Sequence, residues 1–197
     1  MDAGLDIGRG RNGVNGTLLI DDTAQVTLAA NGIDSSVTTL GTCILQGSAS
    51  GSFLGAHKDG VKIDGTLIDL SNPSLASGIG YTVSGNSVTL SGGSFVLFNS
   101  TASRNIVVSS GSSVNVTLFT ADIRPVSGCA FDMAGATVNL RLVAANTLSS
   151  NDGYAGLQAS TGSSLTVSGS GSLTVTGGND GAGIGGGFNK GGGNITI

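Results

Sequence analysis

Apolar and polar side chains alternate in a series of short segments along the chain. Valine, leucine or isoleucine occupies every second position of these segments, and serine, threonine or asparagine fills most positions between them. A period of two residues is typical of a β-strand that packs one face against a core. No segment shows the period of an amphipathic helix, so we predict an all-β protein. The clearest strand-like segments are 112–118, 136–142, 163–169, 171–177 and 193–197.

These strand-like segments recur at a nearly fixed interval. The first apolar residues of three of them, Val114, Val138 and Leu165, are separated by 24 and 27 residues. Leu173, which we assign to a second strand of the same coil as Leu165, lies 22 residues before Ile195. An antiparallel sandwich has no reason to repeat in this way, whereas a parallel solenoid does. We therefore predict a single-stranded right-handed parallel β-helix with roughly eight coils, at about 24 residues per coil.

The two ends of the chain carry the same motif. Residues 7–20 match residues 184–197 without a gap, at an offset of 177 residues, and share two isoleucines, one asparagine and three glycines. Such a match is expected when a chain is cut from a longer array with a large repeating unit, although glycine-rich turns also resemble one another by chance. We expect residues 1–197 to form a single β-helix segment excised from a longer array. Its coils are predicted to be less regular over 1–104 and regular over 105–197.

Composition supports this fold and excludes several classes of protein. The chain contains 35 glycines, no tryptophan and only 10% charged residues, yet 39% of it is hydrophobic, which is too much for a disordered chain. All twelve acidic residues are aspartate, which favours turns over helix bodies. The net charge of −4 and the absence of a basic cluster exclude a nucleic-acid footprint. No apolar run is long enough to cross a bilayer, so we expect no membrane insertion in this segment.

The glycines and cysteines are interpreted structurally. Gly181, Gly183 and Gly186 have the spacing of a dinucleotide-binding loop, but a strand-like segment follows them where such a loop requires a helix. We interpret them as turn residues. Cys43 and Cys129 lie more than three coils apart, beyond the reach of a disulfide, so we expect two buried, unpaired thiols.

Candidate catalytic and ligand-binding residues are few. His57 has no serine or cysteine nearby in a recognisable nucleophile motif, so no catalytic triad can be named. Asp59, Asp64 and Asp69 form the densest acidic segment, and carboxylates on neighbouring coils could bind calcium or act as the acid and base of a glycosidase. Gly65 is expected to break this segment into turns, as is Gly60. Solvated turn aspartates are the simpler interpretation of the cluster.

Three further residues are candidates for ligand contact. Asp152 and Asp180 lie in Asn-Asp-Gly turns that could bind calcium, although neither turn has the spacing of an EF-hand or of a calcium-binding nonapeptide repeat. Phe188 lies in a glycine-rich turn and is expected to be the exposed phenylalanine. No other cofactor is expected. The remaining phenylalanines in strand-like segments are expected in the core, namely Phe53, Phe95, Phe98, Phe119 and Phe131.

Residues 162–187, together with the closing segment GGNITI, resemble the repeats of large secreted or wall-attached bacterial proteins. Many of these are described as adhesin-like or carbohydrate-binding right-handed β-helix proteins, an architecture shared with the broader pectate-lyase-like superfamily. The likeness is clear over about residues 105–197, extends to 3–20 through the offset match, and is faint over 30–100. It implies an extracellular or cell-surface location in a bacterium, with a polysaccharide or host-surface glycan as the partner. No active-site motif of a lyase or polygalacturonase falls on any residue of this chain.

We therefore expect a non-catalytic module for adhesion or carbohydrate binding. A rigid, uncharged face of serine, threonine and asparagine can form hydrogen bonds with hydroxyl groups in a regular array, and each coil would contact neighbouring repeats of the same polypeptide. Two alternatives stay open. One is a structural stalk or spacer of a larger surface protein. The other is a glycan-cleaving enzyme, such as a polysaccharide lyase or a tailspike-like depolymerase, which would need paired carboxylates.

Overall fold

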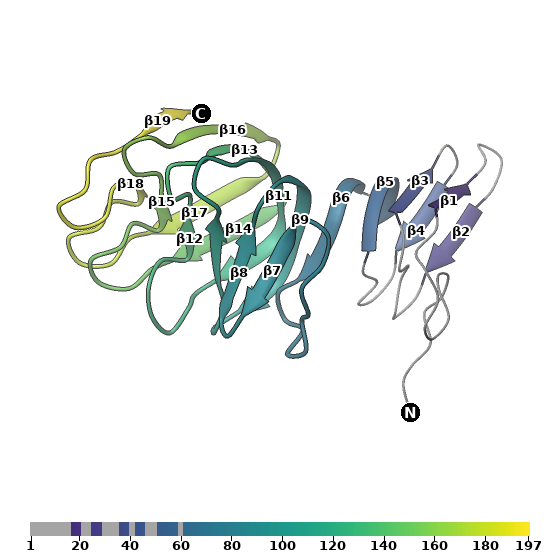
Figure 1. Ribbon diagram of the computed structural model, residues 1–197, viewed down its shortest axis with the longest axis horizontal. Helices are drawn as coiled ribbons and strands as arrows, with labels where there is room; N and C mark the ends of the chain where they lie inside the picture. The colour runs from purple at the N-terminus through teal and green to yellow at the C-terminus, as the bar shows by residue number, and fades with distance from the viewer. Residues whose placement is uncertain (1–16, 21–24, 29–35, 40–41, 46–50, 59–60) are drawn as a thin grey trace. The chain divides into compact units, whose positions relative to one another are not determined.

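The computed structural model describes residues 17–20, 25–28, 36–39, 42–45, 51–58 and 61–197, with side chains from Asp64 onward. The chain divides into two compact units, residues 1–69 and residues 70–197. Every regular secondary-structure element assigned in the described residues is a β-strand (Figure 1), which confirms the all-β prediction. No helix in this described part is long and apolar enough to cross a membrane.

The first unit contains six described strands. Strand β5 pairs in parallel with β3 and β4, β3 pairs in parallel with β1, and β4 pairs in parallel with β2. Strand β6 is antiparallel to β5 and continues through Gly65, so the predicted break at Gly65 is wrong. The bounds are Thr17–Ile20 for β1, Gln25–Leu28 for β2, Ser36–Thr39 for β3, Thr42–Leu45 for β4, Gly51–Lys58 for β5 and Val61–Asp69 for β6.

The second unit is a stack of coils with parallel strands in three rows (Figure 1). It begins with an antiparallel hairpin of β7 (Tyr81–Ser84) and β8 (Ser87–Leu90). The first row continues from β8 through β10 (Asn105–Val108), β12 (Phe131–Asp132), β15 (Leu157–Gln158) and β18 (Ile184–Gly185). The second row consists of β9 (Gly93–Thr101), β11 (Ser113–Ile123), β13 (Thr137–Val143), β16 (Ser164–Gly169) and β19 (Asn194–Thr196). The third row comprises the ends of β9 and β11, then β14 (Ala145–Ser149) and β17 (Ser172–Thr176).

This arrangement confirms the predicted β-solenoid. The described residues contain about five turns, whereas roughly eight coils were predicted for the whole chain. Each coil contributes one strand to the first row and one to the second, and it packs on the coils before and after it. The backbone hydrogen bonds of each strand therefore run along the axis of the stack, from one coil to the next.

The register of the second row confirms two of the three predicted intervals. Val114 pairs with Val138, and Val138 pairs with Leu165. The third interval is wrong. Ile195 was expected one coil after Leu173, but it pairs with Leu165. Leu173 belongs to the third row, where it pairs with Asn146. The coils lengthen along the chain, and the extra residues enter the turns because the strands must stay in register.

The core is formed by the inward-facing residues of these strands. Val114, Val138 and Leu165 are stacked on one another, and none is more than 1% exposed. The predicted burial of phenylalanine is confirmed for the described side chains of Phe95, Phe98, Phe119 and Phe131. The side chain of Phe53 lies outside the described residues.

Each coil bends at a similar place between the second and third rows. Asn99, Thr120 and Ala144 have positive φ angles of 66°, 52° and 56°. The bend in β11 coincides with a shift of register between Phe119 and Asp122. A positive φ is unfavourable for threonine and alanine, so this corner must be stabilised by contacts elsewhere.

Asn146 supplies one such contact, next to the corner at Ala144. Its side chain is 3% exposed, and its Oδ1 accepts a hydrogen bond of 2.9 Å from the backbone N–H of Ala121. Its Nδ2 donates to the carbonyl oxygens of Val143 at 3.1 Å and Ser172 at 3.2 Å. Since Ala121 and Ser172 belong to the coils on either side, Asn146 connects three successive coils.

Asparagine side chains and backbone also stabilise the turns. Asn151 donates from Nδ2 to the carbonyl oxygen of Pro125 at 2.9 Å, in the preceding coil. Asn189 has a positive φ of 53°, a conformation that asparagine adopts more readily than most residues. Asparagine therefore serves the turns at these two positions in two different ways, through its side-chain amide and through its backbone conformation.

Cys129 is unpaired and 4% exposed, as predicted. Its thiol lies 3.1 Å from the carbonyl oxygen of Ala155, to which it donates. Burial raises the pKa of the Cys129 thiol to about 11, so the neutral form is favoured. Cys43 is in β4, and its side chain lies outside the described residues.

Candidate functional site

A row of polar side chains runs across the second row of strands on the side away from the core. Its members occupy matching positions of β9, β11, β13, β16 and β19, and on β11 and β13 their neighbours along the strand are buried. Asn115 donates from Nδ2 to Ser94 Oγ at 3.2 Å, and Asn139 donates from Nδ2 to Asn115 Oδ1 at 2.9 Å. We call this row the polar ladder. Its members are Ser94, Asn115, Asn139, Thr166 and Thr196.

Two flanking rows extend the polar ladder into a surface that we call the outer face. Neighbouring strands are spaced by about 4.8 Å, so the outer face repeats its hydroxyl and amide groups at that interval. Arg141 is the one charged residue in these three rows, and none of their members is acidic. The outer face can therefore donate and accept hydrogen bonds but holds no carboxylate for acid–base chemistry. The flanking residues are Ser113, Thr137, Ser164 and Asn194 on one side and Thr117, Arg141 and Ser168 on the other.

The acidic segment singled out in the sequence falls in the first unit. Asp64 and Asp69 are both in β6, where Asp64 is exposed and Asp69 is 9% exposed. The two described carboxylates therefore differ in their access to solvent. Asp59 lies outside the described residues, and so do the backbone of Gly60 and the side chain of His57.

The two Asn-Asp-Gly turns are stacked, as their similar sequences suggested. Asp152 Oδ1 accepts a hydrogen bond of 3.0 Å from the backbone N–H of Asn179, and Gly153 donates its N–H to the Asn179 carbonyl oxygen at 2.7 Å. Asp152 thus satisfies a backbone donor of the next coil. Asp180 is exposed and has a positive φ of 62°. Among the described side chains, no three histidine, cysteine, aspartate or glutamate residues gather into a metal-binding group, and calcium binding at these turns stays a prediction.

Phe188 is exposed, as predicted, with 57% of its surface accessible. Its backbone N–H donates to the carbonyl oxygen of Gly153 at 2.8 Å, so its turn rests on the turn of the preceding coil. Tyr154, the residue after Gly153, is 41% exposed. Two accessible aromatic side chains are therefore carried on neighbouring turns.

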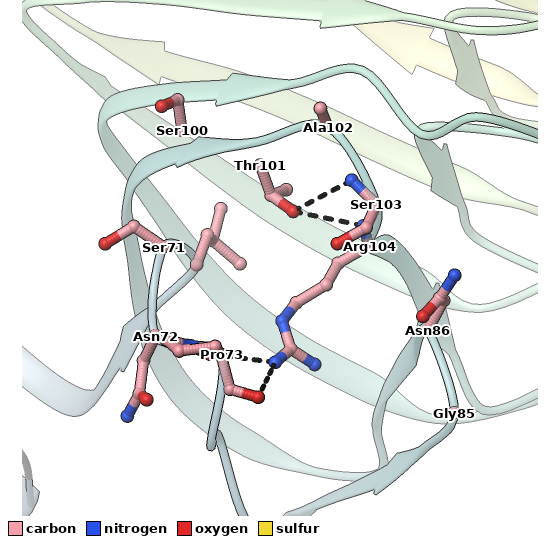
Figure 2. A pocket seen from close by; sticks show the side chains of 11 residues that line it. Ser71, Asn72, Pro73, Gly85, Asn86, Ser100, Thr101, Ala102, Ser103 and Arg104 are labelled. Carbon is pink, nitrogen blue, oxygen red and sulfur yellow. Dashed lines mark hydrogen bonds between the residues drawn. The ribbon is translucent and has the colours of Figure 1, made fainter.

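A polar pocket that the sequence analysis did not identify lies at the start of the second unit. Three segments surround it, namely the loop after Leu70, the hairpin turn at Gly85 and Asn86, and the chain that leaves β9 (Figure 2). Its volume is about 360 Å³. The lining residues are Leu70, Ser71, Asn72, Pro73, Gly85, Asn86, Ser100, Thr101, Ala102, Ser103 and Arg104.

Arg104 is held inside this pocket and is only 8% exposed. Its Nη2 donates to the carbonyl oxygens of Asn72 at 2.8 Å and Pro73 at 3.4 Å. Thr101 Oγ1 accepts from the backbone N–H of Arg104 at 3.0 Å and fixes the turn that carries it. The contacts of Arg104 with Asn72 and Pro73 join residues 32 and 31 positions apart, which is why no local pattern in the sequence revealed the pocket.

Comparisons with known proteins yield no relative: no protein-family model, no curated protein and no solved structure matches this chain. The function must therefore be argued from the geometry described above.

Proposed function

We propose that this protein is a non-catalytic carbohydrate-binding module of a bacterial secreted or cell-surface β-helix protein. The observation that supports this proposal most directly is the outer face, an almost uncharged array of hydroxyl and amide groups repeated coil by coil. An extended glycan also presents hydroxyl groups at regular intervals, so each rung can exchange hydrogen bonds with a different sugar.

The polar ladder is suited to this role because part of it is already ordered. The hydrogen bonds that link Ser94, Asn115 and Asn139 fix the orientation of the two amides before a ligand arrives. A preorganised side chain loses less conformational entropy on binding than a free one. The exposed rings of Tyr154 and Phe188 add apolar surface on the turns, against which the C–H face of a sugar ring can pack.

The resemblance of residues 162–187 to the repeats of bacterial adhesin-like proteins supports a location outside the cell, where glycans are accessible. A structural stalk is the second candidate, because stacked coils add length without needing a binding site. A glycan-cleaving enzyme is less well supported. In the described part of the second unit, Asp122 pairs with Arg124 at 2.6 Å and Asp132 accepts a hydrogen bond from Gln158 at 3.2 Å, so these carboxylates are engaged separately.

The proposal is tested by screening the purified protein against a glycan array, with and without calcium. We expect reproducible binding to one class of polysaccharide. Calcium dependence would direct attention to the aspartates at 59, 64, 69, 152 and 180. No binding by a sample that circular dichroism shows to be folded would contradict the proposal and favour the stalk.

Paired variants locate the binding surface. Replacing Asn139 and Thr166 together with alanine removes two rungs of the outer face, and each lost hydrogen bond is worth about 0.5–1.5 kcal/mol. We expect affinity to fall about tenfold. The matched control replaces Ser172 and Thr174, which are exposed on β17 in the third row, and should bind as the unaltered protein does. Equal affinities in the two double variants would place binding elsewhere.

A further inference from the structure

We propose that the pocket around Arg104 binds an oxyanion, either a carboxylate or a phosphate group. This pocket belongs to the second unit but is separate from the outer face, so the inference does not depend on the proposed carbohydrate binding. Its basis is a buried arginine whose charge has no described counterion and whose hydrogen-bonding capacity is only partly used.

The charge of Arg104 is uncompensated in the described structure. Arg104 is the only charged residue among the eleven that line the pocket. The ion pair found among the described side chains joins Arg124 to Asp122 and does not involve Arg104. Burying a charge without a partner is costly, because the charge loses its hydration shell. An anion that enters the pocket would recover part of that cost.

The guanidinium also retains donors for such an anion. Arginine has five N–H groups, and the hydrogen bonds to Asn72 and Pro73 both come from Nη2. Nε and Nη1 have no hydrogen-bond partner among the described residues. Figure 2 shows the guanidinium among the lining residues, with its second terminal nitrogen directed toward the side where Gly85 and Asn86 lie.

The rest of the lining fits an oxyanion. The hydroxyl groups of Ser100 and Ser103 and the amide of Asn86 are exposed and can donate to oxygens that Arg104 does not reach. None of the lining residues is acidic, so no protein carboxylate competes for the site. A volume of about 360 Å³ lies within the range of small-ligand pockets. Charge-assisted hydrogen bonds from arginine to carboxylate or phosphate are also among the stronger polar contacts in proteins.

A purely structural role is the competing explanation, since Arg104 joins the loop at Asn72 to the chain leaving β9. The two explanations predict different effects of added anions on the protein. Binding of an anion at Arg104 raises the melting temperature in a way that requires this residue, whereas the general stabilisation that phosphate or acetate gives by exclusion from the protein surface does not.

The test measures the melting temperature of the whole chain in increasing acetate or inorganic phosphate, against sodium chloride at equal ionic strength. We expect acetate or phosphate to raise the melting temperature more than chloride does, and the comparison of the two identifies the preferred group. Arg104→Gln should lower this excess to the general salt effect that does not require the pocket. Arg141→Gln, which removes an exposed arginine from β13, should retain it.

A second variant keeps the proposal falsifiable if Arg104→Gln does not fold. Asn86→Asp places a carboxylate on the pocket wall with little change in size, so it should reduce the response to added anions while leaving Arg104 in place. Equal responses of the unaltered protein and either pocket variant would overturn the proposal. The absence of any effect beyond that of chloride in the unaltered protein would overturn it as well.

Discussion

Replacing Asn146 with leucine tests how the successive coils are held together. Leucine has the same branched side-chain skeleton as asparagine, with two methyl groups in place of the amide oxygen and nitrogen, but it can neither donate nor accept a hydrogen bond. The substitution therefore leaves the core filled while it removes the contacts to Ala121, Val143 and Ser172. We expect the protein to become less stable because polar backbone groups would stay buried without their partner.

The expected loss follows from those contacts. The N–H of Ala121 loses its acceptor in a buried position, which costs about 1–3 kcal/mol. The two carbonyl groups lose a donor, although a carbonyl tolerates this better than an N–H does. We therefore expect the free energy of unfolding to fall by about 2–4 kcal/mol, a large part of the 5–15 kcal/mol typical of a folded domain.

Urea denaturation followed by circular dichroism measures this loss. The matched control is Asn139→Leu, which makes the same chemical change at an exposed rung of the polar ladder and should alter stability by less than about 0.5 kcal/mol. If Asn146→Leu were as stable as the control, the bridging role of the Asn146 amide would be refuted.

Three further predictions concern the core, a thiol and a turn. Phe131→Ala should lower the unfolding free energy by about 3–5 kcal/mol, whereas Phe188→Ala at an exposed turn should change it little, as calorimetry or urea denaturation would show. Burial raises the pKa of the Cys129 thiol from 9.0 to about 11. The stability that the buried neutral thiol contributes is therefore intact below pH 9 and is lost as the pH rises through 11. In urea denaturation at several pH values, we expect the stability of Cys129→Ala to fall less between pH 9 and 11 than that of the unaltered protein. An unchanged pH profile of stability would contradict this role of the thiol. Gly178→Ala would press a Cβ atom into the backbone of Asn151, so a clear fall in melting temperature is expected, and an unchanged value would contradict the close packing of these turns.

The sequence was informative wherever a pattern repeated. Alternation placed Val114, Val138 and Leu165 in the core and gave the spacing of their coils, because parallel strands must stay in register. The last interval was mispredicted because Leu173 and Ile195 belong to different rows of strands, and alternation alone does not say to which row a strand belongs.

Single polar residues with long-range contacts were harder to recognise. Asn146 did leave a signal, since it occupies an inward position in phase with Leu148, where an apolar side chain is expected. Arg104 left none, because its partners at Asn72 and Pro73 are brought near only by the fold. Among the candidate ligand-binding residues, Phe188 is the one whose exposure could be predicted from the sequence, because glycines and polar residues flank it in the chain.

The most direct test of carbohydrate binding by the outer face is a calorimetric titration with oligosaccharides of increasing length, taken from the polysaccharide class identified on the array. Five strands about 4.8 Å apart offer successive contacts to one glycan chain. Affinity should therefore rise with length and level off once the chain spans these strands. Equal affinity for a monosaccharide and a long oligosaccharide, or no binding by the folded protein, would contradict the account.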